Sequence, residues 1–324
     1  MMPEFEWFLG VVEDIDDPEE LERVRVRIYG YHTDVKAYLP TSKLRWARVL
    51  DPTTSASISG VGESNGLVCG SWVVGFFLDG RDAQQPAVMF SLKGKPETLA
   101  KPERGFYDPT GAFPRYSQES DVNRLARNKN IDQTIVRSKK DNRVKNIPGT
   151  ANSNQWNEPE TPYDAVYPYN KVKETVSGHV EEFDDTPGKE RIHRYHKAGT
   201  FEETYPDGTK VEKVVKDKYT LVLGDDRVYV QGNVQIFVGG NADIVVNGKT
   251  TLESPEIDMG IEDLQPMVKG DNMANWVVNE LVPWLITHRH IGNLGYPTTP
   301  PITPFEPGTA AQGGKVYSTK NRTQ

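Results

Sequence analysis

The feature that most constrains this chain is an eight-residue repeat between Tyr219 and Ser254. Glycine recurs at one position of every repeat, a valine stands two residues before it, and another aliphatic residue stands four residues after it. The glycines are Gly224, Gly232, Gly240 and Gly248, the valines are Val222, Val230, Val238 and Val246, and the later aliphatics are Val228, Ile236, Ile244 and Leu252. Because a fixed internal period indicates a repeat architecture, we interpret the rest of the chain around it.

The eight-residue period predicts β structure with one apolar face. Side chains of a strand alternate between two faces, so an even period keeps every repeat in the same orientation. From Val228 to Val246 the even positions are apolar or glycine, and the odd positions are polar except Tyr229, Phe237, Gly239 and Val245. Glycine inside a strand pattern marks a sharp bend or a close backbone approach. The repeat therefore predicts a ribbon of β structure that bends once in every octad.

A single copy of this ribbon has too little apolar surface to close a core. Its strand edges also carry unpaired amides, which must be covered or paired. A parallel, intertwined homotrimer meets both needs, because three apolar strips face one axis and each chain pairs with the next. The alternative is a short meander or hairpin, and four repeats in phase favour the trimeric β-helix over it.

Composition agrees with an elongated β protein. The chain has 324 residues, a net charge of -8 and 36% hydrophobic residues, which suggests two or three domains. The single cysteine, Cys69, excludes an intrachain disulfide framework. We see no signal peptide and no apolar run near the ~20 residues of a membrane helix, so we expect synthesis as a soluble product in the host cytoplasm. The acidic balance argues against specific nucleic-acid binding.

Residues 1–116 predict a compact β domain with no strong helix. The expected strands are Phe5–Val12, Arg23–Tyr29, Trp46–Leu50, Trp72–Leu78 and Ala87–Leu92. Five strands in about 90 residues are typical of a small closed barrel such as an OB-fold. Arg23, Arg25 and Arg27 lie on one face of one strand without interleaved stacking aromatics. They predict a solvated or protein-docking face rather than an oligonucleotide site.

Motifs along the chain resemble a known family. Between Trp7 and Arg115 the sequence contains, in order, WFLGVVEDIDDPEELERVRVRIYGYH, LPTSKLRWARVLDPTTSASISGVG, VCGSWVVGFFLDGRDAQQPAVMFSL and KPERGFYDPTGAFPR. The segment Pro168–Val215 and the octads follow. Together they resemble the baseplate central spike proteins of T-even-type contractile-tailed phages, which have an N-terminal OB domain, a similar segment leading into the spike, and a triple-stranded β-helix.

The resemblance implies a function and a set of partners. It implies a homotrimeric spike in the virion tail, with an OB collar that docks onto a baseplate hub trimer at the tail tube. A stiff needle would puncture the host outer envelope on sheath contraction, before genome ejection. A separate small tip protein is a further candidate partner. The alternative within this class is the spike of a secretion-system or tailocin-like contractile particle that carries no genome.

One difference from that family concerns enzymatic activity. The family inserts a lysozyme domain between the OB-fold and the β-helix, whereas here the interval is only Gln118–Thr161. A glycosidase holds two carboxylates across a sugar cleft, and about 45 polar residues do not build one. We therefore expect an extended polar linker over 117–161, with Asp121 and Asp132 as solvated charges, and no enzyme. A peptidoglycan-degrading enzyme that uses Glu103, Asp108 or linker acids is the less favoured alternative.

Residues 162–218 predict an antiparallel β prelude to the octads. The expected strands are Val176–Phe183, Glu190–His196, Thr200–Tyr205 and Lys210–Val215, with a turn at Pro206-Asp207-Gly208. His193 and His196 are three residues apart in a strand pattern, so they face opposite sides and do not form a joint metal site. For His179 and His32 we expect surface or packing roles.

Residues 219–260 are assigned to the β-helix, and a helix is expected within 261–290. Asp271 is a candidate N-cap, and Pro283 is expected to kink or shorten the helix. An apolar stripe at helical spacing predicts packing around the trimer axis. The stripe consists of Met273, Trp276, Val277, Leu281, Trp284 and Leu285. Contact of the two tryptophans with a membrane interface is the alternative.

His288 and His290 form an H-x-H motif after this helix. In an extended segment both imidazoles point to one side, and three chains would bring six nitrogen donors to one axis. Six such donors suit iron or another divalent first-row metal. Short phage spikes that resemble this chain have such a motif around an axial iron. Solvent-exposed or hydrogen-bonded histidines are the alternative. Residues 291–324 follow as an extended Pro- and Thr-rich tail, for which glycan or receptor binding is a third class of function.

Overall fold

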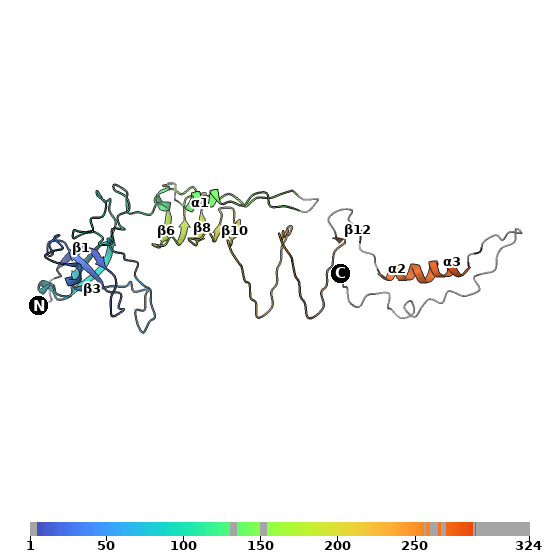
Figure 1. Cartoon of the computed structure of the whole chain (residues 1–324), viewed down its shortest axis with the longest axis horizontal. Helices are drawn as coiled ribbons and strands as arrows, with labels where there is room; N and C mark the ends of the chain where they lie inside the picture. Colours follow the sequence, from blue (N-terminus) through green and yellow to red (C-terminus); the bar gives the residue numbers. More distant parts are fainter. Residues whose placement is uncertain are drawn as a thin grey trace. The chain divides into compact units, whose positions relative to one another are not determined.

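The fold is mainly β, as the sequence predicts. The computed structural model describes residues 5–129, 135–149, 154–255, 257–259, 265–266, 270–287 and 289. The chain divides into two units, one of Met1–Ile147 with Trp156–Gln231 and one of Pro148–Gln155 with Gly232–Gln324. The first unit contains a barrel and a five-stranded sheet, and the second contains most of the octads and a C-terminal helix (Figure 1).

Five strands form a closed barrel in the first unit. They are β1 (Trp7–Asp14), β2 (Val24–Ile28), β3 (Trp46–Val49), β4 (Trp72–Phe77) and β5 (Pro86–Leu92). The order around the barrel is β1-β2-β3-β5-β4, and only the β3–β5 pair is parallel. Two 3-10 turns, η1 (Thr41–Lys43) and η2 (Gly80–Asp82), lie in the connections. The predicted N-terminal OB-like barrel is therefore confirmed.

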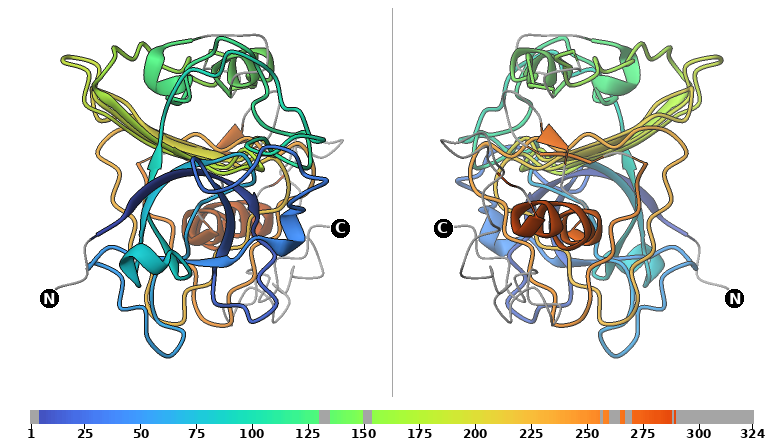
Figure 2. Two further views of the ribbon diagram at one scale, coloured as in Figure 1. Left: turned by 90° about the vertical axis from the view of Figure 1, so that its left-hand side faces the viewer. Right: turned by 90° about the vertical axis from the view of Figure 1, so that its right-hand side faces the viewer.

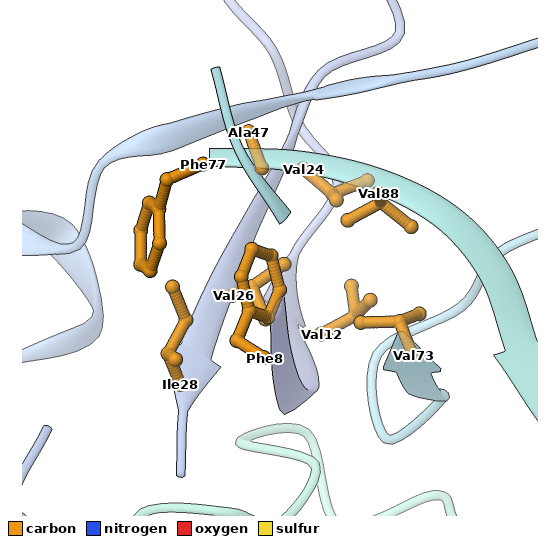
Figure 3. Close-up of a cluster of buried hydrophobic side chains, with 9 residues drawn as sticks. All are labelled: Phe8, Val12, Val24, Val26, Ile28, Ala47, Val73, Phe77 and Val88. Carbon is orange, nitrogen blue, oxygen red and sulfur yellow. The ribbon is translucent and has the colours of Figure 1, made fainter. Parts of the chain in front are cut away.

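Alternating apolar residues of the strands fill the barrel core. The buried cluster consists of Phe8, Val12, Val24, Val26, Ile28, Ala47, Val73, Phe77 and Val88 (Figure 3). Gly75 of β4 stands opposite Val88 of β5. A Cβ there would collide with the carbonyl oxygen of Ala87 and the ring of Phe8, so this position accepts only glycine.

Arg27 of β2 is not solvated. The prediction of a solvated strand face is therefore wrong for this residue. Its side chain is fully buried and its Nε donates to Glu13 Oε1 at 2.7 Å. Its Nη atoms donate to the carbonyls of Thr33 at 2.6 Å and Leu39 at 2.8 Å. Glu13 also accepts from the backbone N–H of Phe106 at 3.1 Å. The pair therefore ties two loops to the barrel, a contact between distant residues that strand alternation does not reveal.

The other two arginines of this stripe also make internal contacts. Arg23 donates from Nε to Asp17 at 2.9 Å. The guanidinium of Arg25 lies 4.4 Å from the ring centroid of Trp46, which comes from the neighbouring strand β3. Trp46 of β3 thus supplies the stacking aromatic ring that the strand of the arginines itself lacks. Arg23, Arg25 and Arg27 all stabilise the barrel.

The segment predicted as an extended linker contains helical turns, which corrects that prediction. A 3-10 turn, η3 (Leu125–Arg127), and a short helix, α1 (Ile135–Asp141), lie within residues 117–161. Leu125 is buried in a cluster that Ile135 and Val136 join. These few apolar residues are enough to hold the segment against a neighbouring sheet, although they are too sparse to show a period.

That sheet is an antiparallel meander of five strands, in the segment where the sequence predicts a β prelude. The strands are β6 (Asn170–Glu174), β7 (Val180–Asp184), β8 (Arg191–Tyr195), β9 (Phe201–Thr204) and β10 (Lys210–Lys213). Sequence reasoning missed β6, whose residues NKVKE show little apolar alternation. The predicted turn before β10 is present, with Gly208 at a φ of 86°. The helix α1 covers one face of the sheet (Figure 2).

The second unit contains a helix over Gly270–Thr287. It runs from α2 (Gly270–Trp276) through a π turn (Val277–Leu281) into α3 (Val282–Thr287), after a two-stranded ladder of β11 (Asp258–Met259) and β12 (Gln265–Pro266). The helix passes through Pro283 instead of ending there. Proline lacks an N–H and crowds the preceding turn, and the wider π turn before it relieves that crowding. No helix among the described residues is long and apolar enough to cross a membrane.

We predict that Glu13→Ala lowers the free energy of unfolding by about 3–5 kcal/mol, because it leaves the Arg27 charge buried and unpaired. Chemical denaturation followed by tryptophan fluorescence measures the loss. The control is Glu19→Ala, which removes a carboxylate that is 66% exposed and should change stability little. Equal effects of the two substitutions would contradict the role assigned to the buried pair.

Candidate functional site

The octad segment forms a regular ribbon without strand partners. Residues 219–255 have no strand pairing with any described residue, and the backbone bends at 223–224, 231–232, 239–240 and 247–248, once in each octad. A Cβ added to any of the four repeat glycines would have no described atom within 4 Å. Crowding inside one chain therefore does not explain why glycine recurs at these bends.

The apolar residues of the ribbon are exposed to nearly the same degree in every repeat. The valines before the glycines, Val222, Val230, Val238 and Val246, are 51%, 48%, 47% and 50% exposed. The aliphatics after them, Val228, Ile236, Ile244 and Leu252, are 81%, 82%, 87% and 77% exposed. The predicted period is thus present as a repeated conformation, and one chain leaves its apolar side chains open to solvent.

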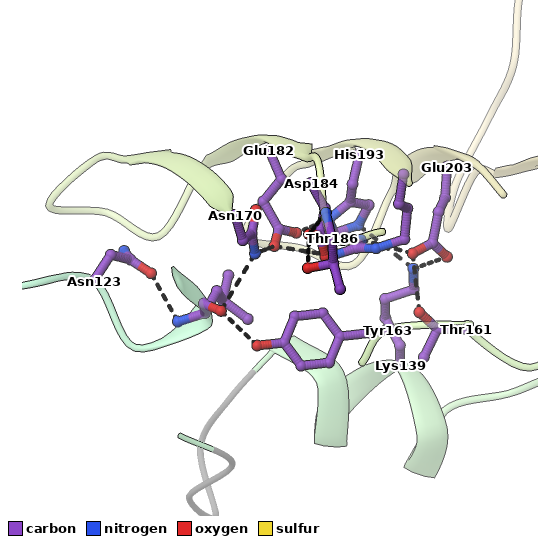
Figure 4. A network of polar contacts seen from close by, with 12 residues as sticks. Asn123, Lys139, Thr161, Tyr163, Asn170, Glu182, Asp184, Thr186, His193 and Glu203 are labelled. Carbon is purple, nitrogen blue, oxygen red and sulfur yellow. Dashed lines mark hydrogen bonds and ion pairs between the residues drawn. The ribbon is translucent and has the colours of Figure 1, made fainter. Parts of the chain in front are cut away.

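The sheet before the ribbon has a charged network on the face covered by α1. The middle cross-strand row of this face consists of Val172, Glu182, His193, Glu203 and Val211. Glu182 contacts His193 Nδ1 at 2.6 Å and accepts from Arg191 at 2.9 Å. Glu203 accepts from Arg191 at 2.8 Å and from Lys139 of α1 at 2.5 Å (Figure 4). Strand parity correctly predicts that His193 and His196 face opposite sides.

Opposite charges are paired within the network. Burial alone would raise the pKa of Glu182, but the hydrogen bond from His193 and the charge of Arg191 outweigh it and lower that pKa to about 2. Burial lowers the pKa of His193, so its imidazole is neutral at pH 7. Two carboxylates, Glu182 and Glu203, then face two cations, Arg191 and Lys139. Paired charges of this kind can be buried, whereas any one of them alone would be costly.

The network attaches the segment before the sheet to the sheet itself. Lys139 reaches it from α1, and its Nζ also lies 3.9 Å from the ring centroid of Phe201. Thr161 donates to Glu203 at 2.9 Å, and the Arg191 guanidinium lies 5.0 Å from the Tyr163 ring centroid. Lys139, Arg191 and Glu203 are buried, and Thr161 and Tyr163 are partly buried, so the arrangement is suited to holding the preceding segment on the sheet. Sequence reasoning missed it because its members come from separate elements.

The other described histidines, His32, His179 and His196, lie apart from this network. His32 Nδ1 accepts from the backbone N–H of Ile28 at 2.9 Å, the packing role expected. The rings of His179 and His196 contact each other with centroids 4.5 Å apart. His288 and His290 lie outside the described residues. Within the part of the chain that is described, no group of three or more His, Cys, Asp or Glu residues is arranged to hold a metal.

The acids considered as catalytic candidates have local roles where they are described. Asp108 is fully buried, and its carboxylate accepts from Thr110, Ala112 and Phe113 at 2.7–3.0 Å. Asp121 accepts from the backbone N–H of Gly94 at 2.8 Å. Glu103 is exposed, and Asp132 lies outside the described residues. These contacts hold loops in place.

Comparison with known proteins agrees with this architecture. Residues 30–172, from the end of β2 into β6, match the Gp5 N-terminal OB domain family. Protein Gp5 of Vibrio phage KVP40 (isolate Vibrio parahaemolyticus/Japan/Matsuzaki/1991) is 39% identical over 258 residues, which are 69% of this chain and 61% of that protein. The pre-baseplate central spike protein Gp5 of Enterobacteria phage T4 is 45% identical over 117 residues, which are 34% of this chain and 20% of that protein.

The chain is a relative of phage baseplate central spike proteins. The resemblance that its motifs predict is thereby confirmed, and the virion tail is its supported location. The chain spans only 61% and 20% of the length of these two spike-protein relatives.

We predict that the folded protein loses stability in two separate pH ranges as the pH falls. The pKa of His193 in the folded state lies below its ordinary 6.5 and that of Glu182 falls from 4.5 to about 2, so the unfolded chain binds more protons in both ranges. Unfolding should become easier as the pH drops below 6.5, and easier again between 4.5 and 2, where Glu182 contributes about 3 kcal/mol.

Denaturant midpoints followed by circular dichroism at successive pH values test this. Glu182→Gln should weaken the dependence in the lower range. Glu181→Gln, one residue away on the opposite face, should leave it unchanged. Identical pH profiles for the two variants would show that the network does not control acid stability.

Proposed function

We propose that this protein is the structural spike of a contractile-tail baseplate and that it acts as a homotrimer. The octads would form a triple-stranded β-helix. The observation that carries this proposal is the ribbon itself, which repeats one conformation four times with open apolar side chains and pairs with no strand in the described part of the chain. The name of one relative, the pre-baseplate central spike protein Gp5 of phage T4, supports the setting.

Burial provides the driving force for assembly. Each octad offers two aliphatic side chains, and transferring one from water to a core is worth about 1.5–3 kcal/mol. Three ribbons around one axis would bury all of them together. The same arrangement would pair the backbone amides of each ribbon with those of the next chain, which removes the exposed edges.

A ribbon closed in this way is suited to transmitting force along its length. Load would pass through a continuous ladder of interchain hydrogen bonds and a dry axial core. On sheath contraction the needle would be driven into the host outer envelope, and the spike would leave the tube before the genome passes. Glycine at each bend would let three backbones turn together close to the axis.

The barrel would serve as a collar that docks onto the baseplate hub. The outer face of the barrel carries a row of apolar side chains that suits contact with a protein partner. Leu9, Val74 and Phe90 stand directly opposite one another on β1, β4 and β5. Leu9 and Phe90 are exposed, as is Trp72 in the adjacent row. An apolar row of this kind on a closed barrel contributes nothing to the barrel core, so its burial requires another surface.

We propose a mechanical role without catalysis. The short interval between barrel and sheet and the local bonding of Asp108 and Asp121 support this view. A peptidoglycan-release assay on the purified full chain tests it, with lysozyme as the positive control. Sustained release of soluble fragments would replace this proposal with an enzymatic one.

We predict that Val238→Asp converts the trimer into single chains, because it would bring three carboxylates together on a dry axis. Sedimentation equilibrium measures the mass against the 36.4 kDa of one chain. The matched control is Gln235→Asp, which places the same charge on the polar face of the same octad and should leave the trimer intact. A wild-type chain that sediments as a monomer would refute the proposed assembly.

We further propose that His288 and His290 of three chains bind one axial iron or other divalent metal ion, a proposal that rests on their sequence spacing alone. Metal analysis of the purified protein should find one ion per three chains. His288→Ala with His290→Ala should abolish it, while His179→Ala, in the first unit, should not. Unchanged metal content in the double variant would exclude this site.

A further inference from the structure

A second row of polar side chains lies beside the charged network, on the covered face of the sheet β6–β10. Strand register places Asn170 of β6 opposite Asp184 of β7, and Asp184 opposite Arg191 of β8. The three residues are deeply buried, with exposed fractions of 4%, 2% and 4%. We call Asn170, Asp184 and Arg191 the polar row. Because opposite residues on adjacent strands have Cβ atoms about 4.5–5.5 Å apart, the three side chains are neighbours.

Each side chain of the polar row has one polar atom without a hydrogen-bond partner among the described residues. These atoms are Asn170 Oδ1, Asp184 Oδ2 and Arg191 Nε. Of the four buried side-chain atoms in this condition within the described part of the chain, three thus belong to one row that crosses three strands. Native proteins rarely leave a buried polar atom unsatisfied, so three of them side by side indicate a shared ligand.

The other polar atoms of Asn170 and Asp184 are already bonded, and these bonds fix both side chains. Asn170 Nδ2 donates to the carbonyl of Leu125 at 3.3 Å and to Glu182 Oε1 at 2.9 Å. Turning this amide over would place its oxygen against two oxygens, which excludes the reversed orientation. Asp184 Oδ1 accepts from the N–H of Thr186 at 3.0 Å and from its hydroxyl at 2.6 Å (Figure 4). Rotating these side chains would therefore break existing bonds without satisfying the unpartnered atoms.

Arg191 is fixed in the same way, and the preceding segment encloses it. Its Nη atoms donate to Glu182 at 2.9 Å and to Glu203 at 2.8 Å, which leaves only Nε without a partner. The ring centroid of Tyr163 lies 5.0 Å from its guanidinium, and Ala165 from the same segment is only 1% exposed. Bulk solvent therefore does not reach Nε, and a partner for it must be held inside the protein.

The three atoms require a ligand that both donates and accepts hydrogen bonds. Asn170 Oδ1 and the Asp184 carboxylate oxygen need donors, whereas Arg191 Nε needs an acceptor. A metal cation cannot accept a hydrogen bond, and it would lie beside the charged guanidinium. An anion would meet two oxygens that also need donors. A water molecule supplies two donors and an acceptor, and buried waters typically make about three hydrogen bonds.

We propose that the polar row binds one internal water molecule, which donates to Asn170 Oδ1 and Asp184 Oδ2 and accepts from Arg191 Nε. This water connects the three adjacent strands β6, β7 and β8. It also completes the bonding of Arg191, whose Nη atoms hold Glu182 and Glu203 in the charged network. The site lies within one chain under its own cover, so it does not depend on the proposed trimer or on the proposed mechanical role.

A crystal structure of the full-length protein, at a resolution that shows ordered solvent, tests this site. We expect one density peak within about 2.5–3.2 Å of Asn170 Oδ1, Asp184 Oδ2 and Arg191 Nε. Arg27 is the internal control in the same map. It is also a buried arginine, but its Nε donates directly to Glu13 at 2.7 Å and should have no water beside it. If the three atoms instead bond directly to other protein groups, with no peak between them, the proposed site is wrong.

Two further measurements identify the ligand and its partners. Crystals grown in rubidium chloride distinguish water from a monovalent cation, because an anomalous rubidium peak in the polar row would overturn the assignment of water. Asp184→Leu replaces one acceptor by an apolar group of similar size, so the density peak should disappear. Asp185→Leu, at a side chain that is 57% exposed, should retain it. A peak that persists in Asp184→Leu would contradict the role of Asp184, and the wild-type map decides the site even if this variant does not fold.

Discussion

The structure depends on one constraint, which is that the octad ribbon has no strand partner among the described residues of its own chain. Its backbone makes no ladder with any described strand, and its aliphatic side chains stay open in every repeat. Aliphatic side chains are unfavourable when they are exposed to water. Backbone amides without a partner become unfavourable when water is excluded from them. Since each repeat has the same geometry, the surface that satisfies one octad must recur every eight residues. An identical ribbon meets that condition directly.

The five-stranded sheet is built differently from the ribbon, although both are β structure. It pairs its own strands and carries its own cover, since α1 and the preceding segment occupy one face. Glu182, Glu203, Arg191 and Lys139 hold that cover with balanced charges. A buried network of this kind demands that every member be present, so it specifies one way for the segment to dock. On the other face Phe183 and Ile192 are 47% and 51% exposed.

The barrel depends on a buried ion pair in a comparable way. Arg27 and Glu13 lie outside the apolar core and connect β1 and β2 to loops that are distant in sequence. The core valines and phenylalanines close the barrel, and the ion pair then decides where the loops lie on it. In both the barrel and the sheet, apolar burial sets the strands and paired charges position the irregular segments.

Local patterns were sufficient for the elements whose residues repeat or alternate. The octad period, the five barrel strands and the opposite facing of His193 and His196 follow from side-chain parity, which depends only on neighbouring residues. Parity did not reveal β6, whose NKVKE sequence alternates too weakly, or the helix α1, which depends on a few apolar contacts with the sheet. The sequence also suggested that Pro283 kinks or shortens the helix, whereas the helix continues through Pro283 after a π turn.

The sequence by itself thus determined the β class, the barrel and the period of the ribbon, because these depend on spacing along the chain. Only the tertiary structure decided that Arg27 is buried, that Lys139 reaches Glu203, and that Phe183 and Ile192 remain exposed. The physical reason is that burial of a side chain depends on which distant segment covers it. That choice depends on charge pairing and packing between elements, which no local pattern contains.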